Sequence, residues 1–250
     1  MEALYPLLDR ANVALGRLDG MSSILPDTSL FLYMYIRKEA VLSSQIEGTQ
    51  SSLSDLLSSE TSDAPPEKLM ETMGDLELFL HDDSVTLPIL IKAALAHVQF
   101  ETIPLLYLSL YFKNHRHPYY DHLQSVRETG NWEAWITFFL EGVIETAGQA
   151  VDTARTVLNQ FAVDQRTIAT SGRSTGAIVT VFSYLQRHPI AITTSIKSST
   201  GLSLPTILRA LTTLSDLKMV HEITGKGRHK IFVYQDYLDI LNQGTEPLGK

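Results

Sequence analysis

Three histidines lie close together in the sequence, at His115, His117 and His122. Imidazole is a common metal ligand and a common general base, so this spacing raises the question of a metal or catalytic site. A zinc site would need further cysteine, histidine or carboxylate ligands. The chain has no cysteine, and no organised set of carboxylates accompanies the histidines. We therefore expect no metal site here and assign no catalytic residue to the segment.

A second group of polar residues lies near the C-terminus, where hydroxyl groups and cations follow a helical pattern. The helix predicted over 203–218 starts at a serine N-cap with proline in its first turn, and its other face is apolar. A glycine-rich basic hairpin tip follows at 225–229. Such side chains contact phosphates and base edges. The residues that we expect to contact nucleic acid are Ser203, Thr206, Arg209, Lys226, Arg228 and Lys230.

Charge is divided unequally along the chain. The net charge of −8 is the sum of −12 over residues 1–172, with 11 Lys+Arg against 23 Asp+Glu, and +4 over residues 173–250, with 9 against 5. The field of each part acts on partners separately, so the basic part is suited to a polyanion such as DNA.

The composition is that of an ordinary globular protein. The chain has 250 residues, 44% hydrophobic and 19% charged, which indicates two folded units. No apolar run approaches the length of a membrane span, and the first residues lack the pattern of a signal peptide. The absence of cysteine suits a reducing compartment. We expect a cytoplasmic protein that makes no contact with a membrane.

Apolar residues recur every three or four positions through most of the chain, which predicts a mainly α fold. The predicted helices are 29–47, 51–58, 67–81, 87–103, 104–115, 119–128, 131–162, 176–187, 193–199 and 203–218. Two β-prone runs, 220–224 and 230–234, predict a small hairpin. The final layout of helix, short helix, longer helix and basic hairpin is that of a winged helix-turn-helix.

Changes in composition divide the chain into four parts. A turn-rich segment with paired prolines at 59–66 ends the first helical region, 1–63, and a helical core follows over 64–163. The polar, glycine-containing segment 164–175 is predicted to be a linker. The winged helix-turn-helix is predicted over 176–243.

One segment, VLSSQIEGTQ at 41–50, carries a resemblance to a known family. It resembles the N-terminal inhibitory segment of the Fic family, whose pattern is filled here by Ser43, Glu47 and Gly48. The strings MGDLE at 73–77 and QFETI at 99–103 resemble the run leading into the family's catalytic loop. One branch of that family also carries a winged-helix tail. The resemblance implies a Fic-like helical bundle followed by the winged helix.

Fic proteins typically transfer AMP from ATP to protein hydroxyl groups through a loop of the form His-Pro-Phe-x-x-Gly-Asn-Gly-Arg. This chain passes from Ile103 directly to Pro104, where that loop is expected, so the core resembles a truncated Fic core. His117-Pro118-Tyr119 imitates the start of the loop. The glycines that would close backbone N–H groups around phosphates are absent after it.

The resemblance leaves three functional hypotheses. The first is a Fic-family protein that has lost nucleotidyl transfer and keeps a DNA-binding or regulatory winged helix, without a cofactor. The second is an active protein adenylyltransferase, using ATP and Mg²⁺ on a protein target, whose missing segments lie outside this chain. The third is a protein-interaction module. In the first case Glu47 has no catalytic-loop arginine to reach, and a helix-ending carboxylate before Gly48 explains it equally well.

A homodimer is expected as well. Removal of a loop and a helix from a packed bundle leaves apolar surface uncovered, and a second copy of the chain can cover it.

Overall fold

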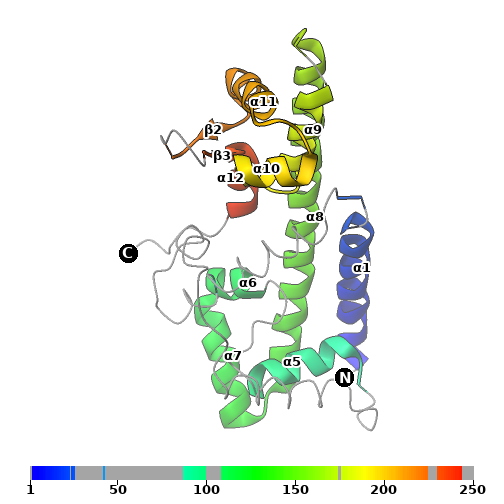
Figure 1. Ribbon diagram of the computed structural model, residues 1–250. Coiled ribbons are helices and arrows are strands. Elements are labelled where there is room, and N and C mark those ends of the chain that lie inside the picture. Colours follow the sequence, from blue (N-terminus) through cyan, green and yellow to red (C-terminus); the bar gives the residue numbers. More distant parts are fainter. Residues whose placement is uncertain are drawn as a thin grey trace. The chain divides into compact units, whose positions relative to one another are not determined.

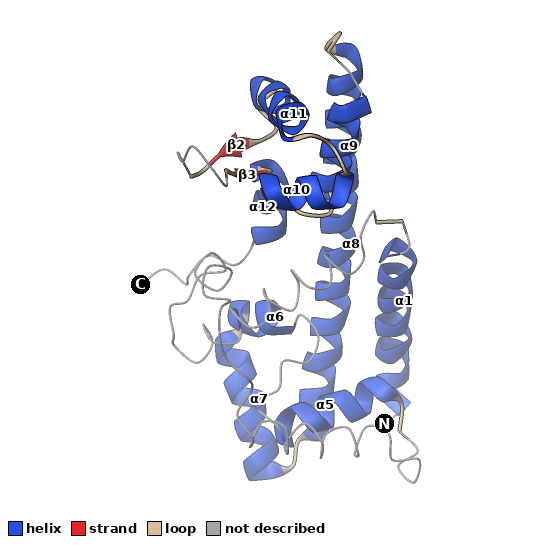
Figure 2. Ribbon diagram, in the orientation of Figure 1, coloured by secondary structure: helices blue, strands red, loops and turns tan. Residues whose placement is uncertain are grey.

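The computed structural model describes residues 2–22, 24–25, 42, 87–99, 108–173, 176–224 and 230–243. This part of the chain is mainly helical with a small antiparallel sheet, which confirms the predicted mainly α class (Figure 2). The chain separates into two compact units, and it passes from the first unit into the C-terminal one between Val151 and Asp152. None of the described helices has the length and apolarity needed to cross a bilayer.

The described part of the first unit is helical. A short 3-10 helix, Glu2–Leu4, leads into α1, Tyr5–Ser22, and the chain continues in α5, Ile89–Gln99, α6, Leu108–Asn114, and α7, Arg116–Thr129. The helix α8, Trp132–Thr170, begins in this unit, with α1 beside it (Figure 1). The predicted helix over 104–115 begins at Leu108 within the described residues, and α7 begins before the predicted residue 119.

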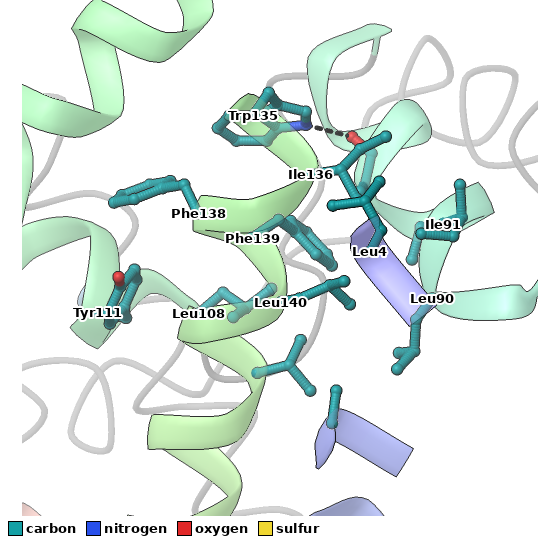
Figure 3. Packing of buried hydrophobic residues seen from close by; sticks show 14 of the residues in the cluster. Leu4, Leu90, Ile91, Leu108, Tyr111, Trp135, Ile136, Phe138, Phe139 and Leu140 are labelled. Atoms are coloured by element: carbon teal, nitrogen blue, oxygen red, sulfur yellow. Dashed lines mark hydrogen bonds between the residues drawn. The ribbon is translucent and has the colours of Figure 1, made fainter. Parts of the chain in front are cut away.

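Trp135 lies at the centre of the first unit's core. Its side chain is fully buried, and its Nε1–H donates a hydrogen bond to the carbonyl oxygen of Ala94 at 2.7 Å, which ties α8 to α5 (Figure 3). The ring lies within 6.1 Å, centroid to centroid, of those of Phe112 and Tyr119. Aromatic contacts and one buried hydrogen bond thus join four helices.

α8 corrects the prediction of a linker at 164–175. The helix continues past the predicted end at residue 162 to Thr170, so the first seven residues of that segment are helical. The reason lies at Asp164, whose polarity suggested a loop. Its carboxylate is buried and accepts hydrogen bonds from the Gln160 amide, at 3.2 Å, and from the Tyr234 hydroxyl. A polar residue with its bonds satisfied does not end a helix.

The described part of the second unit combines the end of α8 with four helices and three strands. In chain order they are α9, Gly176–Leu185, β1, Ile190–Ile192, α10, Thr193–Thr200, α11, Leu204–Asp216, β2, His221–Glu222, β3, Ile231–Val233, and α12, Gln235–Asn242. The strands form an antiparallel sheet in the order β1-β3-β2, with Phe232 of β3 between Ala191 and Glu222. The predictions for α9, α10 and α11 agree with the structure to within two residues at each end, while β1 and α12 were not predicted.

The end of α11 is closed by a Schellman motif. The Met219 N–H donates to the Leu214 carbonyl oxygen at 3.0 Å, and the Lys218 N–H donates to that of Ser215 at 2.9 Å. Lys218 occupies the left-handed position of this motif with a φ of 61°. Glycine is the usual residue there because a Cβ atom strains the left-handed conformation.

We expect Lys218→Gly to stabilise the protein. Relief of left-handed strain gains about 1–2 kcal/mol, and the extra entropy of glycine in the unfolded chain offsets about 0.5–1 kcal/mol of it. Urea unfolding should therefore show a small rise in the free energy of unfolding. Lys218→Ala is the matched control, because it removes the same charge and keeps the strain. An equal rise in both variants would assign the effect to charge.

Candidate nucleic-acid interface

α11 is positioned by its cap and by its apolar face. Ser203 is the N-cap, and its Oγ accepts a hydrogen bond from the Thr206 backbone N–H at 3.4 Å and lies 2.8 Å from the Thr206 hydroxyl. Pro205 stands in the first turn, where its missing N–H costs nothing. The residues that fix the helix against the unit's core are Ile207, Ala210, Leu211 and Leu214, all buried.

The opposite face of α11 is polar and open to solvent. Ser203 and Arg209 are exposed, and Thr206 is half-buried, so the structure places these three predicted residues along one helix. Among the described residues no carboxylate pairs with Arg209. Thr212, one turn after Arg209, is also exposed. Thr212 is not among the predicted contact residues, which lie in the first half of the helix, although the helical period places it on the same exposed face.

α10 and the turn before α11 add a further cation. Gly201 ends α10 in the left-handed conformation, with a φ of 70°, and its N–H donates to the Lys197 carbonyl oxygen at 3.0 Å. Within α10, Thr194, Lys197 and Ser198 are exposed. Lys197 was not predicted as a contact residue, although it lies on the helix directly before the turn to α11.

The hairpin gives a different environment to Lys230. Its Nζ lies 2.8 Å from Glu222 Oε2, and the hydroxyl of Thr224 donates to the other carboxylate oxygen at 3.2 Å. The hydrogen bond from Lys230 lowers the pKa of Glu222. The ammonium group thus fastens β3 to β2 in the free protein. The other two cations of the predicted hairpin, Lys226 and Arg228, lie outside the described residues.

The C-terminal half of α8 is packed into the second unit. The Tyr234 side chain is fully buried and donates its hydroxyl hydrogen bond to Asp164, while Phe161 packs edge-on against Tyr237 at 4.9 Å between ring centroids. Burial, reinforced by the bond to Asp164, raises the pKa of Tyr234. These contacts hold α8 against the start of α12, which follows β3 directly.

The unfolding free energy should fall in alkali. In the first unit, the pKa of Tyr111 is raised to about 12. Burial of the side chain is the main cause, and the negative charges of Glu141 and Glu145 add to it. Tyrosines of the unfolded chain ionise near pH 10, so the stabilisation is complete below about pH 10 and is lost as the pH rises toward the folded value. Urea midpoints measured from about pH 8 to pH 11.5 test this. Tyr111→Phe should flatten the decline, and Tyr120→Phe, at an exposed tyrosine, should leave it unchanged.

The three histidines of the first unit lie in different environments. His115 donates from Nδ1 to the Tyr111 carbonyl oxygen at 3.0 Å, with its ring 4.2 Å from that of Tyr111. The ring of His122 lies 4.9 Å from that of Phe138, and His117 is exposed in the first turn of α7. Across the described part of the chain no three His, Asp or Glu side chains gather as a metal site would require.

Comparison with known families bears on the N-terminal part of the chain. Residues 5–75 match the family model for the Fic/DOC family N-terminal region. The match supports membership of the Fic family, as the resemblance at 41–50 indicates. It begins at the first residue of α1 and includes Ser43, Glu47 and Gly48, which lie outside the described residues. Members of the Fic family are typically AMP-transferases.

Proposed function

We propose that residues 176–243 form a winged helix-turn-helix that binds duplex DNA, in a Fic-family protein that does not itself transfer AMP. The observation that carries the proposal is the order α9-β1-α10-α11-β2-β3 with its β1-β3-β2 sheet, which presents the polar face of α11 to solvent. In a winged helix this third helix enters the major groove, and the β2-β3 hairpin is the wing.

The chemistry of the face suits DNA. Arg209 is the exposed cation of α11 and is suited to a bidentate contact with guanine or to a phosphate, while Thr206 and Thr212 place hydroxyl groups on either side of it. Lys197 on α10 adds a phosphate contact. We assign Lys230 a structural role through its bond to Glu222, and Lys226 and Arg228 remain proposed phosphate contacts at the hairpin tip.

Loss of AMP transfer is supported by the segment that imitates the start of the Fic loop. His117 and Pro118 lie in the first turn of α7, and the residues that follow, through Thr129, continue the helix. Backbone N–H groups inside a helix are already bonded within it and cannot cradle phosphates. The helical segment at His117 therefore cannot take the place of the glycine-rich loop that the family's chemistry needs.

DNA binding is tested by fluorescence anisotropy with the full chain and a labelled random-sequence duplex. We expect the affinity to fall steeply between about 50 and 200 mM NaCl, because phosphate contacts release counterions. Arg209→Ala should weaken binding by about 1–3 kcal/mol, roughly 5- to 150-fold. Arg155→Ala, at an exposed arginine of α8, is the matched control. A salt-independent affinity, or equal effects of the two variants, would overturn the proposal.

The inactive Fic assignment has a separate test. The protein is incubated with labelled ATP and Mg²⁺, alone and with cell lysate, as wild type and as Glu47→Gly. We expect no AMP on protein in either form. Labelling that increases in Glu47→Gly would show a working transferase and would reject this part of the proposal without affecting the DNA-binding part.

A further inference from the structure

The N-terminal end of α11 exposes apolar side chains. Leu204, directly after the N-cap, is 42% exposed, and Pro205 beside it is exposed as well. Leu208 follows Leu204 one turn later and is half-buried, so the apolar surface continues along the helix. Single exposed leucines are common on protein surfaces. The position of this one distinguishes it, because it stands at the start of the helix that is proposed to enter the major groove, where recognition helices contact base edges.

The hydroxyl groups along the same helix are largely engaged within it. The Ser203 and Thr206 hydroxyls bond to each other at 2.8 Å, which uses the proton of one of them. The Thr212 hydroxyl donates to the Leu208 carbonyl oxygen at 2.9 Å. Two of these three hydroxyl protons are therefore used inside α11 and cannot be donated to a base. The first turn thus offers a base mainly apolar surface.

Charge favours the N-terminal end of α11 as the end that meets the DNA. Asp216 is the last residue of the helix, and its exposed carboxylate lies 2.9 Å from Nη1 of Arg173. Phosphates repel a carboxylate at this end, and an exposed ion pair offsets that repulsion only in part. At the other end the helix macrodipole places partial positive charge, which attracts a polyanion. The first turn of α11, with Leu204, therefore leads into the groove.

We propose that Leu204 contacts the 5-methyl group of a thymine in the major groove and so makes a T·A pair part of the preferred DNA site. The inference rests on the DNA binding proposed above. Thymine is the base that presents an apolar group in this groove, which suits a leucine side chain. Arg209 stands five residues after Leu204 on α11, about 7.5 Å along the helix axis or about two base-pair steps. The expected site therefore has the thymine about two base pairs from the pair that Arg209 contacts.

Replacing thymine by uracil tests the contact, because it removes the methyl group and keeps the hydrogen-bonding groups of the base. A preferred site is first selected from a randomised duplex pool with the full chain, and each thymine in it is then replaced by uracil in turn. Fluorescence anisotropy of the wild type should show at least one position at which uracil weakens binding about fourfold, the effect of one buried methyl group. Leu204→Ala should bind the thymine and uracil duplexes equally at that position.

Two further variants separate base contact from a general loss of apolar surface. Leu204→Met keeps an apolar side chain of similar volume and should retain the thymine preference. Val179→Ala is the matched control, because it shortens a side chain of α9 that is 49% exposed and should also retain the preference.

The outcomes distinguish this inference from the proposed function. The absence of a uracil effect at every position, a thymine preference that survives in Leu204→Ala, or a selection that enriches no sequence would each overturn the contact and leave phosphate-driven binding intact. Failure of the wild type to bind any duplex would overturn the proposed function and this inference together.

Discussion

Replacing Trp135 by alanine is expected to lower the free energy of unfolding of the first unit by about 3–5 kcal/mol. The ring is fully buried and contacts aromatic side chains from two further helices. Its loss leaves a large cavity and also leaves the Ala94 carbonyl oxygen without the indole donor. We expect Trp135→Phe to be intermediate, because phenylalanine fills most of the space but cannot donate the hydrogen bond.

The second tryptophan of the chain supplies the control. Trp132 stands three residues earlier on α8 and is 39% exposed, so Trp132→Ala should cost less than about 1 kcal/mol. Urea unfolding followed by far-ultraviolet circular dichroism compares the variants, and the remaining tryptophan in each reports fluorescence from the first unit alone. Equal destabilisation by Trp135→Ala and Trp132→Ala would contradict the central place of Trp135 in this core.

Removing either partner of the Tyr234–Asp164 hydrogen bond is expected to destabilise the second unit by about 1–3 kcal/mol. Both side chains are buried, so Asp164→Ala leaves the tyrosine hydroxyl without an acceptor, and Tyr234→Phe leaves the carboxylate with Gln160 as its remaining donor. The double variant should lose less than the sum of the single losses, because each single change already removes the shared bond.

Hydrogen exchange measured by mass spectrometry resolves this effect by region. We expect faster exchange in the C-terminal half of α8 and in α12 of both single variants. Asp152→Ala is the control on the same helix, since the Asp152 side chain is 77% exposed and its partner is an exposed arginine. Additive losses in the double variant would show that the two groups act independently and would refute the coupling.

The short-range signals in the sequence determined much of the second unit. Gly201 ends α10 and the N-cap Ser203 starts α11. Both are local signals that can be read from a few neighbouring residues. The exposed position of Arg209 follows from the same local period, since buried residues stand two positions before it and directly after it.

The elements that were missed depend on contacts between distant residues. Nothing near Asp164 reveals that a hydroxyl seventy positions away donates a hydrogen bond to its buried carboxylate, so its polarity was interpreted as a linker. β1 has three residues and exists because β3 pairs with it. The ion pair of Lys230 with Glu222 likewise depends on the register of the hairpin. The presence of several cations in the hairpin sequence does not specify that register.

The uninterrupted course of α8 determines how the C-terminal unit must be excised for study. A fragment that starts at Gly176, where sequence composition changes, would lack Phe161, Asp164 and Ile168, all of them buried. It would expose the aromatic side of Tyr237 and leave the Tyr234 hydroxyl without its acceptor. A fragment that starts at Asp152 keeps all of these residues. If the shorter fragment failed to express, the cause would be the position of the cut, and the failure would carry no information about whether the unit binds a partner.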